Sequence, residues 1–267
     1  MKRVDKIRVI IVETFFVIFY ILVFPYYFFN KKNHRKKIKR NPFSLSFHVK
    51  LASKYPLIYD LSMFINNFPY PICVYKAMPK LSGRVLQVGC GTGLLNKYYA
   101  RHFSREDVEF VNLDVSERSL MYGKRHGRIS SYVCGDITKI KDFDSLGKFD
   151  TIVFARSFHH IMNHKKALSN CEKLLNDNGF ILIADIASIK DEEENEASVV
   201  NSSVDGVIWR YNIPQFKKRI FSVLPESLIV EKIFDVRQIN ITNYNLKYPN
   251  TDIYAILRRG DVQNDIR

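Results

Sequence analysis

Residues 85–93 read VLQVGCGTG, in which four β-prone positions run into glycines at positions 89, 91 and 93. Glycine within a strand costs stability, because it loses more backbone entropy than other residues and packs no side chain. The spacing therefore indicates a turn whose backbone must bend tightly and lie open to a ligand. A helix that begins near Leu94 would present free N–H groups and a positive dipole end to that ligand, which suits a carboxylate or a phosphate.

After this turn, apolar runs alternate with helical stretches. Strands that alternate with helices predict a parallel sheet that is covered on both faces, and hence an α/β fold. We expect strands at 84–88, 109–113, 129–134, 149–155, 180–185, 228–236 and 252–257. We expect helices at 94–102, 117–124, 165–175 and 204–223, and a solvated surface segment at 191–196.

The spacing of the glycines distinguishes between nucleotide cofactors. The dinucleotide fingerprint GxGxxG requires glycine at position 94, which is Leu94 here, so a nicotinamide-dependent reductase is disfavoured. Asp114 ends the second predicted strand, where an acid can accept hydrogen bonds from ribose hydroxyls. Asp136 ends the third predicted strand, near the place where an adenine would lie.

Five sequence blocks stand in order at suitable spacings: VLQVGCGTG, VNLDVS, YVCGDI, FDTIVFARSFHHI and LLNDNGFILIADI. Together they resemble the class I S-adenosylmethionine-dependent methyltransferases over residues 80–190. The resemblance implies a Rossmann-like, doubly wound sheet of seven strands, mostly parallel with the last strand antiparallel. It also implies S-adenosyl-L-methionine as the cofactor.

By this resemblance, the glycines would line the methionine part of the cofactor, and Asp114 would hold the ribose. Val115 would lie against the adenine, Asp136 and Ile137 would bind its edge and face, and Ala155 with Arg156 would border the sulfonium. The expected cofactor-binding residues are Gln87, Gly89, Cys90, Gly91, Gly93, Asp114, Val115, Asp136, Ile137, Ala155 and Arg156. The family usually has an acid at the position of Gln87, whose amide oxygen accepts a hydrogen bond from an ammonium group but carries no charge.

Two histidines follow the fourth predicted strand, where an acceptor would approach the methyl group. Methyl transfer from a sulfonium is an in-line displacement, in which the enzyme aligns the acceptor and removes a proton where needed. His159 or His160 can supply the general base, since unperturbed imidazole titrates at about pH 6.5. The alternative is that one histidine packs and the other is solvated. The residues FARS at this point argue against the methyltransferases of base amino groups, which often carry a (D/N)PP(Y/F/W) block.

The net charge of +14 is concentrated at the N-terminus, because residues 1–40 contain eleven Lys or Arg and two acids and so carry +9. These cations flank an apolar run at 9–29, which as a helix would be about 31 Å long and would match a bilayer core. A membrane-spanning anchor is the favoured interpretation, ahead of an interfacial helix and of a buried core helix. A cleaved signal peptide is disfavoured, since no small-residue cleavage site follows. If the helix spans, its heavier cationic flank at 31–40 places the rest of the chain on the cytosolic side.

The chain therefore divides into three predicted parts: the anchor and its basic flank at 1–40, a proline-broken cap on the substrate side at 41–80, and the methyltransferase domain at 81–260. The cap would contain short helices near 46–53 and 57–66. The predicted function is methyl transfer to a small or lipid-like apolar acceptor by a membrane-anchored enzyme. The alternatives are a membrane-tethered scaffold that binds the cofactor without turnover, and a protein methyltransferase.

Other partners are disfavoured by the pattern of residues. Nucleic acid is disfavoured because the basic residues cluster beside an apolar helix, and no aromatic-basic module of the RNA-binding kind is visible. The four cysteines are scattered singly, without a CxxC pair, so the sequence predicts neither a metal site nor a disulfide framework.

Overall fold

The computed structural model describes residues 73–103, 108–189, 197–202, 206–237 and 250–260, together with residues 55, 57, 59–61 and 63. The predicted helices at 9–29 and 46–53, the basic flank at 31–40 and the acidic segment at 191–196 lie outside the described residues. Within the described part of the chain, no helix is long and apolar enough to span a membrane.

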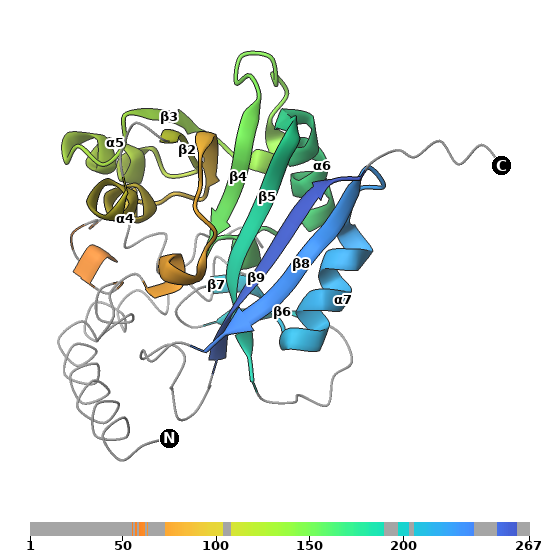
Figure 1. The fold of residues 1–267 in the computed structure, drawn as a ribbon. Coiled ribbons are helices and arrows are strands. Elements are labelled where there is room, and N and C mark those ends of the chain that lie inside the picture. The colour runs from red at the N-terminus through yellow and green to blue at the C-terminus, as the bar shows by residue number, and fades with distance from the viewer. Residues whose placement is uncertain are drawn as a thin grey trace, which may run out of the picture.

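A seven-stranded sheet with helices on both faces forms the body of the domain (Figure 1). Its strands are β1 (Gly83–Val88), β2 (Val108–Asp114), β3 (Ser131–Cys134), β4 (Phe149–Ala155), β5 (Leu175–Ser188), β8 (Leu228–Val236) and β9 (Asn250–Arg259). Their order is β3-β2-β1-β4-β5-β9-β8, in which β1 to β5 pair in parallel and β9 is antiparallel to both of its neighbours. The predicted seven-stranded, mostly parallel sheet with an antiparallel last strand is confirmed.

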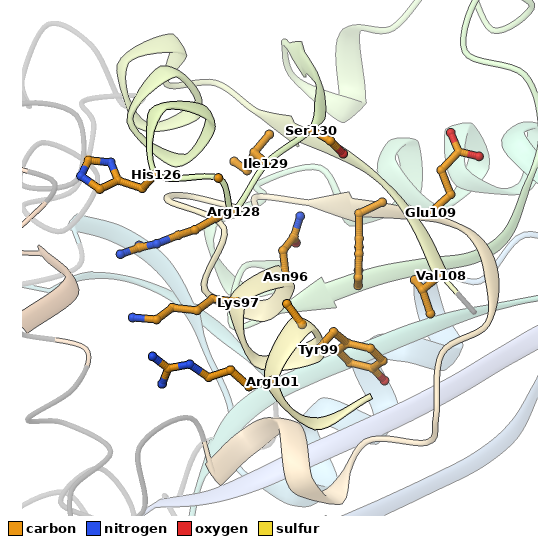
Figure 2. A pocket seen from close by; sticks show the side chains of 13 residues that line it. Asn96, Lys97, Tyr99, Arg101, Val108, Glu109, His126, Arg128, Ile129 and Ser130 are labelled. Atoms are coloured by element: carbon orange, nitrogen blue, oxygen red, sulfur yellow. The ribbon is translucent and has the colours of Figure 1, made fainter. Parts of the chain in front are cut away.

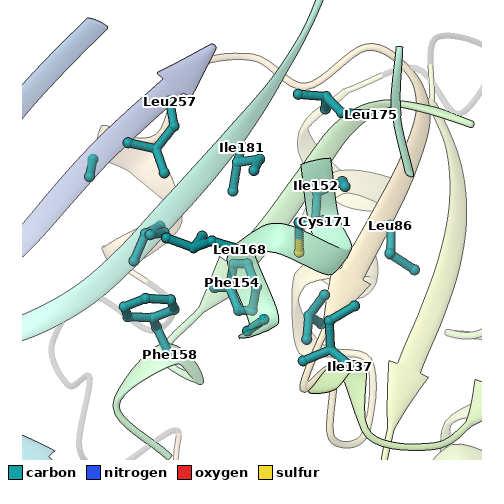
Figure 3. Close-up of a cluster of buried hydrophobic side chains, with 14 of the residues drawn as sticks. Leu86, Ile137, Ile152, Phe154, Phe158, Leu168, Cys171, Leu175, Ile181 and Leu257 are labelled. Carbon is teal, nitrogen blue, oxygen red and sulfur yellow. The ribbon is translucent and has the colours of Figure 1, made fainter. Parts of the chain in front are cut away.

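The helices cover the sheet because its strands are apolar on both faces. They are α4 (Leu94–His102), α5 (Glu117–Arg125), α6 (His164–Leu174) and α7 (Ile213–Val223), with the short 3-10 turns η1 (Cys73–Ala77), η3 (Ile137–Lys139) and η4 (Phe158–His160). The adjacent residues Val85 and Leu86 of β1 belong to core clusters on opposite faces of the sheet. The larger cluster packs the strands against α6 and α7, through residues such as Leu168 (Figure 3). The other packs them against α4 and η1.

Side chains near the helix starts account for where several helices begin. Ser116 caps α5 and Asn163 caps α6 by accepting a backbone N–H in the first turn. Asn212 and Gln215 form a reciprocal capping box at the start of α7, where Pro214 also stands. By contrast, α4 begins directly after Gly93, which has no side chain to cap it.

The predicted helical stretch at 204–223 is wrong in its first part. Residues Gly206–Arg210 form strand β7, which pairs antiparallel with β6 (Ser198–Ser202) in a separate two-stranded sheet, and carries Trp209. The run VIW is β-branched and aromatic, and such residues favour a pleated surface. The helix begins only at Ile213, after its Asn212 cap.

Candidate functional site

The loops that follow the parallel strands lie along one edge of the sheet, where ligands bind in folds of this kind. Four hydrogen bonds join these loops into a continuous row. Three of them are between main-chain groups: Gly89 N–H donates to the Leu113 carbonyl (2.7 Å), Gly135 N–H to the Asp114 carbonyl (2.9 Å) and Arg156 N–H to the Ala184 carbonyl (2.7 Å). In the fourth, the Ser157 hydroxyl donates to the Val88 carbonyl (2.6 Å). The predicted site residues after β1, β2, β3 and β4 therefore share one edge, held largely by main-chain contacts.

The glycine turn after β1 requires left-handed backbone at all three glycines, with φ of 70° at Gly89, 55° at Gly91 and 77° at Gly93. A Cβ on Gly89 would lie 2.5 Å from Ser157 Cβ, and one on Gly93 would lie 2.8 Å from a side-chain carbon of Ile129. At Gly91 the nearest atom is the Tyr59 hydroxyl oxygen, 3.6 Å away. Gly89 and Gly93 are thus also required by packing within the protein, whereas a Cβ at Gly91 would make only ordinary van der Waals contact with Tyr59.

Asp114 at the end of β2 holds this turn in place. One carboxylate oxygen accepts the Gly91 N–H and the other accepts the Ser116 N–H, each at 2.8 Å. Burial raises the pKa of Asp114, and these hydrogen bonds oppose that increase. A carboxylate has about four acceptor positions, so capacity remains for hydroxyl groups of a ligand. The next side chain, Val115, is 53% exposed and offers an apolar surface beside them.

Gln87 places a buried hydrogen-bond acceptor at the end of β1. Its side chain is 2% exposed, and its Oε1 has no hydrogen-bond partner among the described residues. Leaving a buried acceptor unpaired costs about 1–3 kcal/mol, so the position is suited to a donor that arrives with a ligand. An ammonium group such as that of a methionine moiety fits this requirement.

The residues after β3 are placed at the same edge, but their side chains already have partners. Asp136 caps η3, because its Oδ1 accepts the Thr138 N–H at 2.9 Å and the Thr138 hydroxyl at 2.8 Å. Ile137 is buried in the larger core cluster. Cys90, in the glycine turn, is also buried, and burial raises the pKa of its thiol. Contacts of these three residues with an adenine or a methionine moiety stay predictions.

Ala155 ends β4, and Arg156 after it has a φ of 58°, the only positive φ of a non-glycine residue in the described part of the chain. The Arg156 guanidinium pairs with the buried carboxylate of Asp252 on β9. Because this pairing compensates the arginine charge, Arg156 can stand at the strand end without placing an uncompensated cation there. Its predicted place beside the sulfonium is compatible with this arrangement and stays a prediction.

The two candidate histidines of the η4 turn differ in their burial and in their contacts. His159 is 6% exposed, and its Nδ1 lies 2.5 Å from Asp185 Oδ1. The His159 N–H donates to Asp185 Oδ2 at 2.9 Å, and the Tyr211 hydroxyl donates to the same oxygen at 2.6 Å. His160 is partly exposed, with its ring centroid 4.1 Å from that of His159.

This network fixes the orientation of the His159 ring. Burial alone would raise the pKa of Asp185, but the His159 charge and hydrogen bonds from His159, Tyr211 and the Ile186 N–H outweigh it and lower the pKa. An ionised Asp185 accepts the Nδ1 proton of His159, so Nε2 is the nitrogen without a proton in the neutral ring. Asp185 and Tyr211 were absent from the site residues predicted from sequence. The available signal was the position of Asp185 in the last motif block, on the strand beside the one that leads to His159.

A segment from the predicted cap lies against the glycine turn. Tyr59 lies over Gly91, and Asp60 accepts hydrogen bonds from Thr92 Oγ1 at 2.6 Å and from an Arg128 guanidinium nitrogen at 2.5 Å. These contacts join residues far apart in the sequence. Tyr59 and Asp60 are thus further residues of the site that the sequence motifs did not indicate.

The comparisons with known proteins agree with this geometry. Residues 86–183 match a family model described as a methyltransferase domain. The ubiquinone biosynthesis O-methyltransferase of Rhodopseudomonas palustris (strain HaA2) is 28% identical over 114 residues, which cover 41% of this chain and 42% of that protein. The demethylmenaquinone methyltransferase of Leptospira interrogans is 25% identical over 150 residues, which cover 53% of this chain and 59% of that protein.

Solved structures show the same fold. The O-methyltransferase of a trans-AT polyketide synthase from Brevibacillus brevis, in complex with S-adenosyl-L-homocysteine, superposes with a TM-score of 0.53 at 15% identity. The superposition covers 81% of this chain and 80% of that one. The family match shows a methyltransferase domain over residues 86–183, and the chain shares its fold with this solved methyltransferase.

Proposed function

We propose that this chain transfers the methyl group of S-adenosyl-L-methionine to a hydroxyl of a small, apolar, quinol-like acceptor at a membrane. The observation that carries the proposal is the pairing of His159 with Asp185 on the same sheet edge as the glycine turn. A cofactor cradle and an oriented base are the two parts that this reaction requires.

The residues of the edge fit the cofactor by chemistry. Gln87 Oε1 would accept a hydrogen bond from the methionine ammonium, and Asp114 would accept the ribose hydroxyls while it holds Gly91. Asp136 and Ile137 would border the adenine. When bound, the cofactor supplies an electrophilic methyl group on a sulfonium. The protein's contribution is to hold the acceptor in line with that methyl and to keep water out.

His159 would take the proton of the acceptor hydroxyl on Nε2. Asp185 fixes the ring through Nδ1 and stabilises the imidazolium that forms, and Tyr211 holds the other Asp185 oxygen. A positioned general base typically contributes about 10²–10⁴ to a rate. His159 is the stronger candidate of the two histidines because the buried Asp185 carboxylate fixes its ring.

The relatives and the N-terminal sequence support the acceptor class and the membrane location. The relatives named above are a ubiquinone biosynthesis enzyme and a demethylmenaquinone methyltransferase, and such acceptors are apolar molecules of the membrane. The matches span 42% and 59% of those proteins. The apolar run at 9–29 with its basic flank at 31–40 would anchor the chain in the membrane, with the catalytic domain on the cytosolic side.

The test begins with calorimetric titration of the full chain in detergent with S-adenosyl-L-methionine and S-adenosyl-L-homocysteine, with NADH and NADPH as controls. Labelled methyl transfer is then measured to demethylated quinols, to membrane lipid extracts and to cell protein. We expect Asp114→Asn to lose cofactor binding, and His159→Gln to keep binding but lose transfer.

Three outcomes would contradict the proposal. A folded chain that does not bind the cofactor refutes it at the first step. Binding without transfer to any acceptor favours the scaffold, for which the uncharged Gln87 is the supporting feature. Label that appears only in protein favours a protein methyltransferase.

A further inference from the structure

A cluster of cations lies on α4 and just after α5, beside the glycine turn. The basic face is formed by Lys97 and Arg101 on α4 and by His126 and Arg128 just after α5. Lys97, Arg101, His126 and Arg128 line a cavity of about 840 Å³. Figure 2 shows Lys97, Arg101 and Arg128 extending in the same direction, with Glu109 at the opposite end of the cavity.

The positive charge of this face is only partly compensated by the described residues. Arg128 pairs with Asp60 at 2.5 Å, and Glu109 is 3.7 Å from the Arg84 guanidinium. No described acid forms an ion pair with Lys97 or Arg101. Partial burial lowers the pKa of Lys97, and repulsion from Arg128 and Arg101 lowers it further.

Exposed leucines adjoin this basic face. Leu57 is 71% exposed and Leu61 is 49% exposed, and their spacing of four residues puts them on one side of a helical turn. Asp60, next to Leu61, ties this turn to Arg128 and Thr92. Lys97 is close enough to Asp60 for that carboxylate to affect its pKa. The result is a composite surface in which apolar side chains stand beside excess cations.

We propose that this composite surface, made of Leu57, Leu61 and the basic face, docks the domain onto an anionic lipid surface. Leucines enter the boundary between headgroups and acyl chains, while Lys and Arg bind the acidic headgroups at roughly 1 kcal/mol each. This contact is separate from the anchor at 9–29, because it belongs to the folded domain. It does not depend on methyl transfer.

Docking in this way would also orient the site. Tyr59 lies between the two leucines in sequence and covers Gly91 of the glycine turn. The same short segment would therefore contact the lipid through Leu57 and Leu61, while its Tyr59 contacts the glycine turn that would hold the cofactor. An acceptor dissolved in the bilayer would then approach the protein close to the cradle.

The test is hydrogen exchange of the full chain in vesicles of phosphatidylcholine, with and without phosphatidylglycerol. We expect slower exchange at 57–63, 94–103 and 124–130 in the anionic vesicles only, and its loss in 0.5 M salt, where the Debye length is only about 4 Å. Lys97→Gln combined with Arg101→Gln should reduce the ratio of docked to undocked domain about 30-fold, at roughly fivefold for each cation.

The matched control replaces two exposed lysines on α6, Lys165→Gln with Lys166→Gln, and should leave the protection unchanged. Leu57→Ser with Leu61→Ser should also weaken docking, and unchanged protection in this variant would overturn the apolar part of the surface. Circular dichroism establishes that each variant is folded. Equal exchange in both vesicle types, an equal effect of the control, or protection by duplex RNA without protection by anionic vesicles would each overturn the proposal.

Discussion

His164 provides a quantitative test of the packing beneath the η4 turn. It opens α6 and is fully buried, with its ring stacked on Phe158 at a centroid distance of 3.9 Å. Its Nε2 lies 3.0 Å from the Phe158 carbonyl, and its Nδ1 accepts the Arg219 Nε–H at 3.2 Å. Burial lowers the pKa of His164 to about 4, and the neighbouring Arg219 charge acts in the same direction. The ring is therefore neutral in the folded protein at neutral pH.

Acidification should destabilise the fold through this residue. His164 has a folded pKa of about 4 and an ordinary pKa of 6.5, so the unfolded chain takes up the proton first as pH falls. Its contribution to the free energy of unfolding is thus fully present above about pH 6.5 and is lost as pH falls through about 4. The expected loss is about 2 kcal/mol at about pH 5 and about 3 kcal/mol at about pH 4.

The assay is urea unfolding of the full chain and of His164→Gln across this pH range, followed by the fluorescence of Trp209, which is the only tryptophan. Glutamine retains a donor for the Phe158 carbonyl but does not titrate. Because the His159–Asp185 pair is present in both proteins, its own pH dependence largely cancels in the comparison. The stability difference between the two proteins should shrink by about 3 kcal/mol between about pH 7.5 and pH 4. A difference that stays constant with pH would refute the reasoning.

Further substitutions separate catalysis, packing and cofactor binding. Asp185→Asn should lower kcat by about 10²–10⁴ with an unchanged cofactor Kd, because it removes the charge that stabilises the His159 imidazolium; steady-state kinetics and calorimetry check this. Gly89→Ala should destabilise the fold by about 2–4 kcal/mol through its left-handed φ and the Ser157 contact, whereas Gly91→Ala should cost only about 1–2 kcal/mol. Thermal unfolding of the two variants measures that contrast, and equal losses would contradict it. Gln87→Ala should weaken S-adenosyl-L-methionine binding about tenfold, by removing the acceptor for its ammonium, and an unchanged Kd would remove Gln87 from the site.

The central elements of the fold could be predicted from sequence because local signals agree there. The strand at Phe149–Ala155 and the helix at Leu94–His102 have the predicted bounds, since an apolar run or a glycine turn marks each boundary. The helix predicted around Trp209 is wrong, because a short apolar run fits a strand or a helix equally well by periodicity. This run is a strand because it pairs with Ser198–Ser202, and local sequence does not reveal that pairing.

The candidate site was predictable only as far as its motifs extend. The glycines, Asp114 and the two histidines follow strand ends that the sequence shows directly. The contacts of Asp185 with His159 and Tyr211 each join residues 26 positions apart, and no local pattern encodes them. The contacts of Tyr59 and Asp60 with the glycine turn likewise join residues that are far apart in the sequence, so no local pattern encodes them.

Main-chain groups make three of the four hydrogen bonds along the strand ends, including Gly89 to Leu113 and Gly135 to Asp114. Such bonds survive most changes of side chain, whereas the proposed acceptor side depends on the side chains of His159 on η4 and of Tyr211 between β7 and α7. Divergence of substrate can therefore proceed by substitutions around η4, β7 and α7 while the nucleotide half of the site is inherited intact. Directed evolution toward a new methyl acceptor would do best to randomise those peripheral elements and leave the edge of the parallel strands fixed.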